Sequence, residues 1–246
     1  MALDRILFNA FALLPSIFLP LSAHAELGPC KPLAERKVLI CGEGNGAAIV
    51  IRETVSPSGR LALAWRTTAG PPTEEPGDGD NELLIIRLAD GAVLARGQTD
   101  YWDTGAGHVN RLEEFATWSP DSRFLIRSFH SRWSTDIVEL YAIGADDAVT
   151  GPFDLRKPLD SVTRTRLKAR VKDADNYDFS LTGMKDEEKP LAVDNRGRIR
   201  AEVMLWVPKP GPFYYYTVRA QAVRAKGSLE AQILSLIYRG MEPKID

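Results

Sequence analysis

One local pattern occurs three times in this 246-residue chain: a tight turn, then an arginine, then an apolar stretch. The copies are SPSGR at 56–60, SPDSR at 119–123 and DNRGR at 194–198. Ser or Asp at the first position can form a hydrogen bond with the backbone two residues further on. Pro at the second position fixes φ, and Gly at the fourth relieves backbone strain where the chain leaves the turn. The second copy has Ser122 in place of glycine, and the third lacks proline. A repeated turn-and-strand unit favours an all-β chain.

The rest of the sequence also favours strands. Two apolar runs flank Asp90-Gly91 within ELLIIRLADGAVLAR at 82–96. This pattern predicts a hairpin with a type I′ turn, in which both central residues have positive φ. Residues 198–207, 213–223 and 229–238 read as a three-stranded meander.

Two segments remain open between strand and helix. In 228–239, apolar residues also fit a helical face that ends at Gly240, but a turn at 226–227 follows a β-rich run directly and favours a strand. In 159–171, helical spacing competes with a threonine-rich composition and an alternating stretch near its end. Either structure is compatible with that second segment.

The first 25 residues have the pattern of a secretion signal. A short n-region precedes an apolar stretch from Ile6 to Leu21, and Ala23-His24-Ala25 precedes Glu26. We expect cleavage between Ala25 and Glu26, with a retained anchor as the alternative. The remaining residues, 26–246, are then one all-β domain with no stable membrane insertion after cleavage. The predicted location is periplasmic or secreted.

The two cysteines, Cys30 and Cys41, fit an oxidising compartment. We expect a structural disulfide between them. A thiol pair for metal or redox chemistry is the alternative, but the spacing is neither CxxC nor a zinc pattern.

Composition excludes several classes of protein. Apolar residues make up 44% and charged residues 26%, close to the globular average. With 31 Lys and Arg against 33 Asp and Glu, the net charge is −2, so no basic excess is present to bind nucleic acid. The basic run at 164–170 is expected to be a solvated face. Nucleophile-elbow, HExxH, P-loop and dinucleotide-binding motifs are absent from the sequence. We therefore assign no catalytic residue, metal or cofactor.

A family resemblance follows from the second turn. Residues 116–126 (ATWSPDSRFLI), followed by 136–141 (DIVELY), resemble the WSPDG-type, WD40-like β-propeller repeat of the bacterial Tol propeller kind. Residues 56–96 are similar, and the resemblance covers about half of the mature chain. It implies that the turn joins the first two strands of a four-stranded blade.

The resemblance predicts blade-like units near 47–97, 115–150 and 191–240. Their turns lie farther apart in the sequence than the ~40–45 residues of a compact blade, and a closed ring usually has about 4–8 blades. The expected fold is therefore all-β, with propeller-like blades of antiparallel strands in a small or incomplete propeller. A β-sandwich is the alternative.

Loop aromatics and histidines are the candidate binding residues. We predict a binding rim whose members come from two loops: Tyr101, Trp102, Asp103, His108, His130 and Trp133. If both loops meet, Asp103 and Asp136 would complete a metal or acid–base cluster with the two histidines. Trp65, Trp118 and Trp206 lie within strands and are expected in the core. Acidic loops at 78–82 and 173–178 have calcium-like composition but are read as solvated turns.

The expected function is that of an exported, non-catalytic binding or scaffold protein of the bacterial envelope. Its partner would be an envelope protein or a small ligand. The alternative is a hydrolase or metal-dependent enzyme with a site in the 101–136 loops. The oligomeric state is open.

Overall fold

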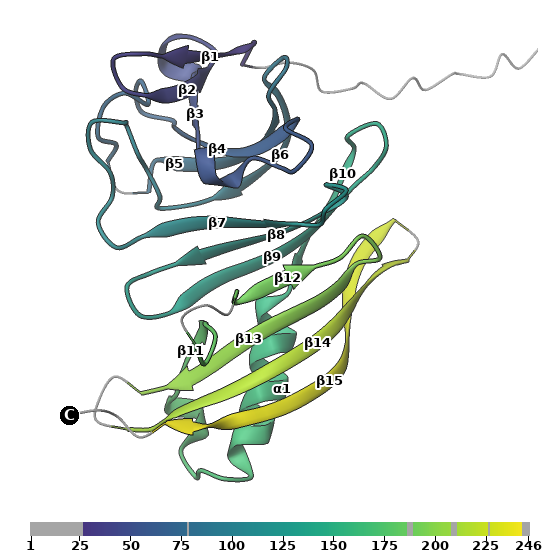
Figure 1. Ribbon diagram of the computed structural model, residues 1–246. Helices are drawn as coiled ribbons and strands as arrows, with labels where there is room; N and C mark the ends of the chain where they lie inside the picture. The colour runs from purple at the N-terminus through teal and green to yellow at the C-terminus, as the bar shows by residue number, and fades with distance from the viewer. Residues whose placement is uncertain (1–26, 78, 186–188, 208–210, 226, 243–246) are drawn as a thin grey trace, which may run out of the picture.

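The structure is a computed structural model that describes residues 27–77, 79–185, 189–207, 211–225 and 227–242. The predicted signal peptide and its cleavage junction lie outside the described residues. The all-β class is confirmed: three antiparallel sheets follow one another from the top to the bottom of Figure 1, with one α-helix, α1.

The first sheet has six strands, paired in sequence order. Its elements are β1 (Cys30–Leu33), β2 (Val38–Cys41), η1 (Gly44–Gly46), β3 (Ala48–Val50), η2 (Arg52–Thr54), β4 (Leu61–Thr67), β5 (Asn81–Arg87) and β6 (Ala92–Gln98).

The second sheet has four strands in the order β10-β9-β8-β7. Its strands are β7 (Glu113–Trp118), β8 (Phe124–His130), β9 (Thr135–Ile143) and β10 (Val149–Asp154).

The third sheet has the order β11-β13-β14-β15, and β12 also pairs with β13. The elements that follow the second sheet are α1 (Arg156–Lys168), η3 (Ala174–Asn176), β11 (Asp178–Leu181), β12 (Leu191–Val193), β13 (Arg198–Trp206), β14 (Phe213–Ala225) and β15 (Ser228–Glu242). The strand preferred for 228–239 is confirmed as β15.

Each sheet contains one four-stranded meander: β3–β6, β7–β10 and β12–β15. In each, the repeated turn lies between the first and second strands. The described residues do not close the three sheets into a propeller ring. The resemblance to the WSPDG-type repeat stays a prediction.

The three copies of the turn have the same geometry. In each, the backbone N–H of the fourth residue donates to the carbonyl of the first, at 2.8 to 2.9 Å. The fourth residue has a left-handed φ: +68° at Gly59, +61° at Ser122 and +73° at Gly197. The fourth residue therefore adopts the left-handed backbone conformation in all three copies, even where serine replaces glycine.

The Asp90-Gly91 hairpin forms, but its predicted turn type is wrong. Arg87 pairs with Ala92, so four residues rather than two connect β5 to β6. Gly91 has φ +68°, its N–H donates to the Arg87 carbonyl at 2.9 Å, and Asp90 is not among the residues with positive φ. A Cβ on Gly91 would lie 1.9 Å from the Gly28 carbonyl oxygen, so close approach of another segment also favours glycine here.

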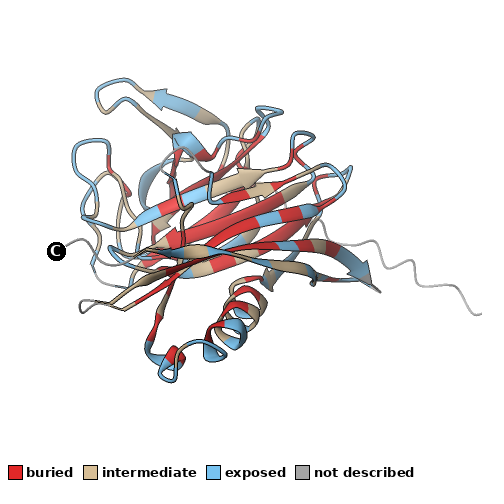
Figure 2. Cartoon of the chain, turned by 60° about the horizontal axis from the view of Figure 1, so that its bottom comes forward, coloured by how far each residue is buried: buried red, intermediate tan, exposed pale blue. Residues whose placement is uncertain are grey.

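The segment left open at 159–171 is mainly helical, which makes the strand alternative wrong. Leu159, Thr163 and Leu167 recur at helical spacing and are fully buried, so α1 packs one face inward (Figure 2). Arg166 and Lys168 in the last turn interact favourably with the helix dipole. Tertiary burial of this face outweighs the low helix propensity of threonine.

Buried side chains fill the spaces between sheets. The apolar core between the first two sheets is Ile49, Ile51, Leu63, Trp65, Leu83, Ile85, Leu125 and Tyr141. A larger core joins the second sheet, α1 and the inner face of the third sheet. Cys30 and Cys41, directly paired across β1 and β2, form the predicted disulfide.

Candidate functional site

The predicted binding rim does not form one site. Tyr101, Asp103 and His108 line a hollow of about 360 Å³ on the first sheet, here called the sheet-1 hollow. His130 and Trp133 line a hollow of about 750 Å³ beside the third sheet, here called the Trp133 hollow. Neither hollow is lined by residues of the other group.

Trp102 lies apart from both groups. It lines a smaller hollow of about 350 Å³ against the loop that precedes β5, together with Val109 and Leu112. The loop after β6 thus directs its two neighbouring aromatic side chains, Tyr101 and Trp102, into different spaces.

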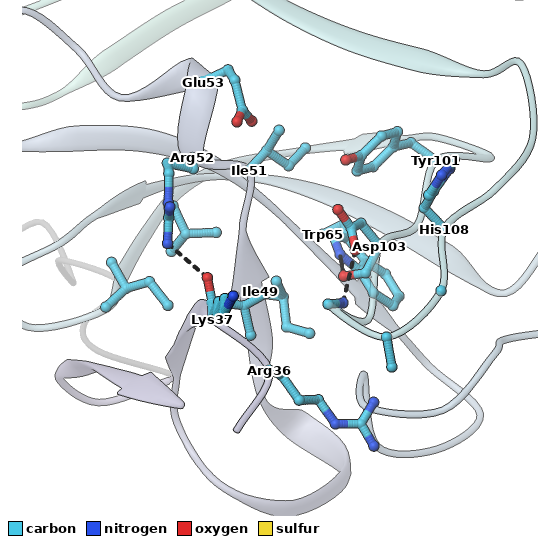
Figure 3. A pocket seen from close by; sticks show the side chains of 16 residues that line it. Arg36, Lys37, Ile49, Ile51, Arg52, Glu53, Trp65, Tyr101, Asp103 and His108 are labelled. Carbon is cyan, nitrogen blue, oxygen red and sulfur yellow. Dashed lines mark hydrogen bonds between the residues drawn. The ribbon is translucent and has the colours of Figure 1, made fainter. Parts of the chain in front are cut away.

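The sheet-1 hollow is built where the 101–108 loop folds over the first sheet (Figure 3). Asp103 and His108 form an isolated antiparallel bridge, and the Asp103 carboxylate accepts the Gly105 N–H at 2.7 Å. The Trp65 indole N–H donates to the Asp103 carbonyl at 3.1 Å. These contacts fix the loop on the buried Trp65, which explains its defined shape.

The cations around this hollow hold backbone segments together. Arg36 donates to the Thr73 carbonyl at 2.7 Å, and Arg52 donates to the Lys37 carbonyl at 2.6 Å (Figure 3). These two guanidinium groups tie loops of the first sheet to one another. Burial, together with the nearby charge of Asp103, raises the pKa of the Tyr101 phenol, so it stays protonated at neutral pH.

The Trp133 hollow lies on the outer face of the third sheet. Along β11 and just beyond it, Asp178, Ser180 and Thr182 line the hollow, and the residues between them, Phe179 and Leu181, are buried, although Leu181 also contributes to the lining. Alternation along a strand places the three polar side chains on one face.

The strands beside β11 add apolar and aromatic groups to the same floor. In register with β11, Ser180 pairs with Met204 and Asp178 with Trp206 on β13, and Phe213 of β14 completes the floor. The β8–β9 loop, residues 131–134, forms the facing wall. Leu181 N–H donates to Thr135 Oγ1 at 2.9 Å, which fixes the wall to β11.

Trp133 is the most exposed aromatic side chain among the described residues, with 60% of its surface accessible. Its ring centroid lies 6.0 Å from that of Trp206, and the Arg132 guanidinium lies 4.4 Å from the Trp133 centroid. The Arg132 guanidinium, the exposed Trp133 indole and the buried Trp206 indole therefore lie next to one another in space. Large exposed aromatic side chains are costly to hydrate and are enriched in binding sites.

His130 lies at the junction of the Trp133 hollow and a neighbouring hollow of about 490 Å³ that is lined by β7 and β12. Its Nε2 is 3.1 Å from Ser128 Oγ and its Nδ1 is 3.2 Å from Thr135 Oγ1. Burial lowers the pKa of His130 to about 4, and the charge of Asp136 opposes that shift. At neutral pH the ring is a neutral hydrogen-bonding link between two hydroxyls.

The structure does not assemble the metal or acid–base cluster that would form if the two loops met. His108 and His130 line different hollows. Within the described parts of the chain, no group of three His, Cys, Asp or Glu side chains is placed to hold a metal ion. In the acidic loop at 173–178, residues 174–176 form η3, and Asp175 pairs with Lys168 at 2.8 Å; Asp78 lies outside the described residues.

Sequence reasoning missed the polar row on β11 and the role of Trp206. Trp206 is buried as expected, with 8% of its surface exposed, yet it lines the Trp133 hollow. The sequence did contain a signal for this polar row, because polar and apolar residues alternate strictly from Asp178 to Thr182, as expected for a strand with one polar face.

No protein-family model, curated protein or solved structure matches the chain. Among the residues described, no helix has the length and apolar character needed to cross a membrane.

Proposed function

We propose that this chain is an exported, non-catalytic binding protein of the bacterial envelope, periplasmic or secreted, that recognises its ligand in the Trp133 hollow. The observation that carries the proposal is the pairing of an exposed indole, Trp133, with a buried indole, Trp206, beside a row of polar side chains. Small-molecule sites combine apolar or aromatic walls with a few placed polar groups, and their volumes are about 300–1,000 Å³. The hollow has both properties.

The export part of the proposal rests on the signal-like first 25 residues and on the Cys30–Cys41 disulfide. Disulfides persist in oxidising environments such as the periplasm. The three meanders with a shared turn support a propeller-like arrangement of blade units, a type of fold in which connecting loops present binding residues.

The binding role is favoured over an enzyme by the surroundings of the histidines. Both ring nitrogens of His130 lie beside hydroxyl groups of the protein itself, and the ring is held neutral by burial. His108 is exposed, and its Nδ1 lies 2.8 Å from the Val109 carbonyl. Among the residues that the structure describes, neither imidazole is paired with a carboxylate and a nucleophile in the arrangement that nucleophilic catalysis needs.

Site-specific photo-crosslinking tests the proposal. A benzophenone amino acid replaces Trp133 in the full-length protein produced in its native host, and ultraviolet light is applied to intact cells. We expect an adduct whose added mass is measured by mass spectrometry of the intact protein, which detects a small ligand as well as a protein partner. The matched control position is Leu234, which is similarly exposed at 56% but lies on β15, outside the hollow.

Equal adducts at positions 133 and 234, or no adduct at either, would refute a binding role for the hollow. Export is tested by fractionation and N-terminal sequencing. A first residue of Glu26 in the periplasm or medium is the expected result, and protein that retains Met1 in the cytoplasm contradicts it.

A further inference from the structure

We infer that the ligand of the Trp133 hollow is a neutral carbohydrate, bound through a pyranose ring that stacks on Trp133 and hydroxyls that bond to the β11 row. This inference rests on the proposed binding function and specifies its ligand class.

The polar row has unused hydrogen-bonding capacity. Asp178, Ser180 and Thr182 line the hollow, and none of their side chains has a hydrogen-bond partner within the described parts of the chain. Side chains two residues apart on a strand project from one face roughly 7 Å apart. A carboxylate only accepts, whereas hydroxyls both donate and accept, so the row is complementary to the hydroxyl groups of a sugar.

The aromatic surface supplies the second half of a sugar site. A pyranose ring has an apolar face of C–H groups and a rim of hydroxyls, so it packs flat on an aromatic ring while its rim stays hydrogen-bonded. Trp133 presents such a ring at the wall of the hollow, and Phe213 and Trp206 lie in the floor. Trp and Tyr are suited to ligands of this mixed character because they are apolar with one polar group.

A buried donor in the hollow is also unsatisfied. Only 8% of the Trp206 surface is exposed, and its Nε1 has no hydrogen-bond partner among the described residues. An unsatisfied buried donor is unfavourable. The Nε1 atom is inaccessible to solvent in this conformation, so a hydroxyl oxygen that enters the hollow accepts from this N–H once the indole turns toward it.

The charge of the hollow favours a neutral ligand. Its lining contains the acids Glu113 and Asp178 and one strong cation, Arg132. Anionic ligands would meet two carboxylates. A cationic side chain at the Trp133 ring would be repelled by the Arg132 guanidinium, which lies over that ring, whereas a neutral ligand would not. A sugar that stacks on that face displaces Arg132, whose guanidinium then has donors for ring hydroxyls.

An extended peptide fits less well. Peptides that bind sheet edges use main-chain hydrogen bonds, but the β11 edge is joined to the second sheet through the Leu181 N–H and Thr135. The groups that face the hollow are side chains rather than a free strand edge.

The test is titration calorimetry of the full chain after export, with four neutral probes: cellotetraose, chitotetraose, maltotetraose and mannotetraose. We expect binding of at least one. For that probe, Trp133→Ala should weaken binding at least tenfold, Asp178→Asn at least fivefold and Trp206→Phe at least threefold. Leu234→Ala is the matched control and should bind as the wild type does. Circular dichroism verifies that each variant is folded.

Three results would overturn the carbohydrate assignment. They are binding of none of the four probes, binding that Trp133→Ala leaves unchanged, and binding of an arginine-rich or proline-rich decapeptide with the same dependence on Trp133. If the carbohydrate tests fail but crosslinking at position 133 succeeds, the binding function is supported and only the carbohydrate assignment is wrong. If crosslinking fails as well, both proposals are wrong.

Discussion

The backbone N–H of Ser58 donates to the Oγ of Ser122 at 3.1 Å, which joins the repeated turn of the first sheet to that of the second. The N–H of Asp121 in turn donates to the Oδ1 of Asn195 in the third copy, at 3.0 Å. The three copies of the turn, which are far apart in sequence, therefore contact one another, although the bonded residues occupy different positions within their copies. The turn of the second sheet thus lies between those of the first and third sheets and bonds to both.

The fourth position of the turn offers a matched pair of substitutions. Gly59 and Gly197 have nearly the same left-handed φ, but a Cβ at Gly59 would meet nothing within 4 Å, whereas one at Gly197 would lie 2.9 Å from Phe124 Cζ. Gly59→Ala should cost about 1 kcal/mol of unfolding free energy, because only the backbone is strained. Gly197→Ala should cost roughly 2–4 kcal/mol, because overpacking adds to that strain.

Urea unfolding of both variants and the wild type measures the difference. Equal losses at the two glycines would contradict the contact between the turn and Phe124. Ser122 shows that a residue with a side chain is accommodated at this position of the second copy.

Local features of the fold could be predicted from the sequence, because they depend on neighbouring residues. The turns, the disulfide and the strand at 228–242 belong to this group. The loop that connects β5 to β6 was predicted two residues too short, since Leu88 and Ala89 are apolar like the strand before them. Whether three meanders close into a ring depends on contacts between sheets, which no short motif encodes.

The candidate site was only half predictable. Trp133, one of the predicted loop aromatics, lines a hollow, but the predicted rim joined residues that the fold directs to different sheets. Tyr101 and His108 follow β6 of the first sheet, whereas His130 ends β8 of the second sheet and Trp133 follows it. The partners of Trp133 on β11 and β13 lie more than 40 positions further along the chain, and only the tertiary fold brings them together.

A buried ion pair joins strands of the second sheet, and its arginine also bonds to the last residue of β6 in the first sheet. Arg127 donates to both carboxylate oxygens of Glu114, at 2.6 and 3.1 Å, and also to Glu139 and the Gln98 carbonyl. Both side chains of the pair are at most 1% exposed. Arg127→Met should lower the unfolding free energy by about 3–5 kcal/mol, because it leaves a carboxylate buried without its partner.

The double variant Arg127→Met/Glu114→Leu should lose less than the sum of the two single variants, as a thermodynamic cycle from urea unfolding will show. The exposed Lys31–Glu43 pair, 2.8 Å apart, is the control: Lys31→Met should leave the midpoint unchanged. Strict additivity at Arg127 and Glu114 would show that the two groups do not stabilise each other.

Stability should fall in weak acid because of His130. Burial lowers its folded pKa to about 4 from the ordinary 6.5, so the unfolded chain binds a proton that the folded chain does not. The contribution is fully present above about pH 6.5 and is lost as the pH falls toward 4, by up to about 3 kcal/mol. His130→Asn should flatten this part of the pH profile.

Unfolding midpoints in urea, measured at half-unit steps from pH 7.5 to 4, test this. His108→Asn changes an exposed imidazole in the other hollow and should keep the loss seen in the wild type. A His130→Asn profile parallel to that of the wild type would assign the acid sensitivity to other groups.

The disulfide should stabilise the outer strands of the first sheet rather than the whole chain. Cys30 on β1 and Cys41 on β2 are directly opposite each other, and β1 is an edge strand with no second neighbour among the described residues. Closing a loop of this length contributes roughly 3 kcal/mol in the chain-entropy model. Cys30→Ala/Cys41→Ala should therefore let β1 and β2 open locally, since local opening needs fewer contacts to break than global unfolding.

Hydrogen exchange of the double variant should become faster at the amides of residues 31–40 and stay slow in β13 and β14. Equal acceleration throughout the chain would instead mean that the disulfide stabilises all three sheets as one cooperative unit.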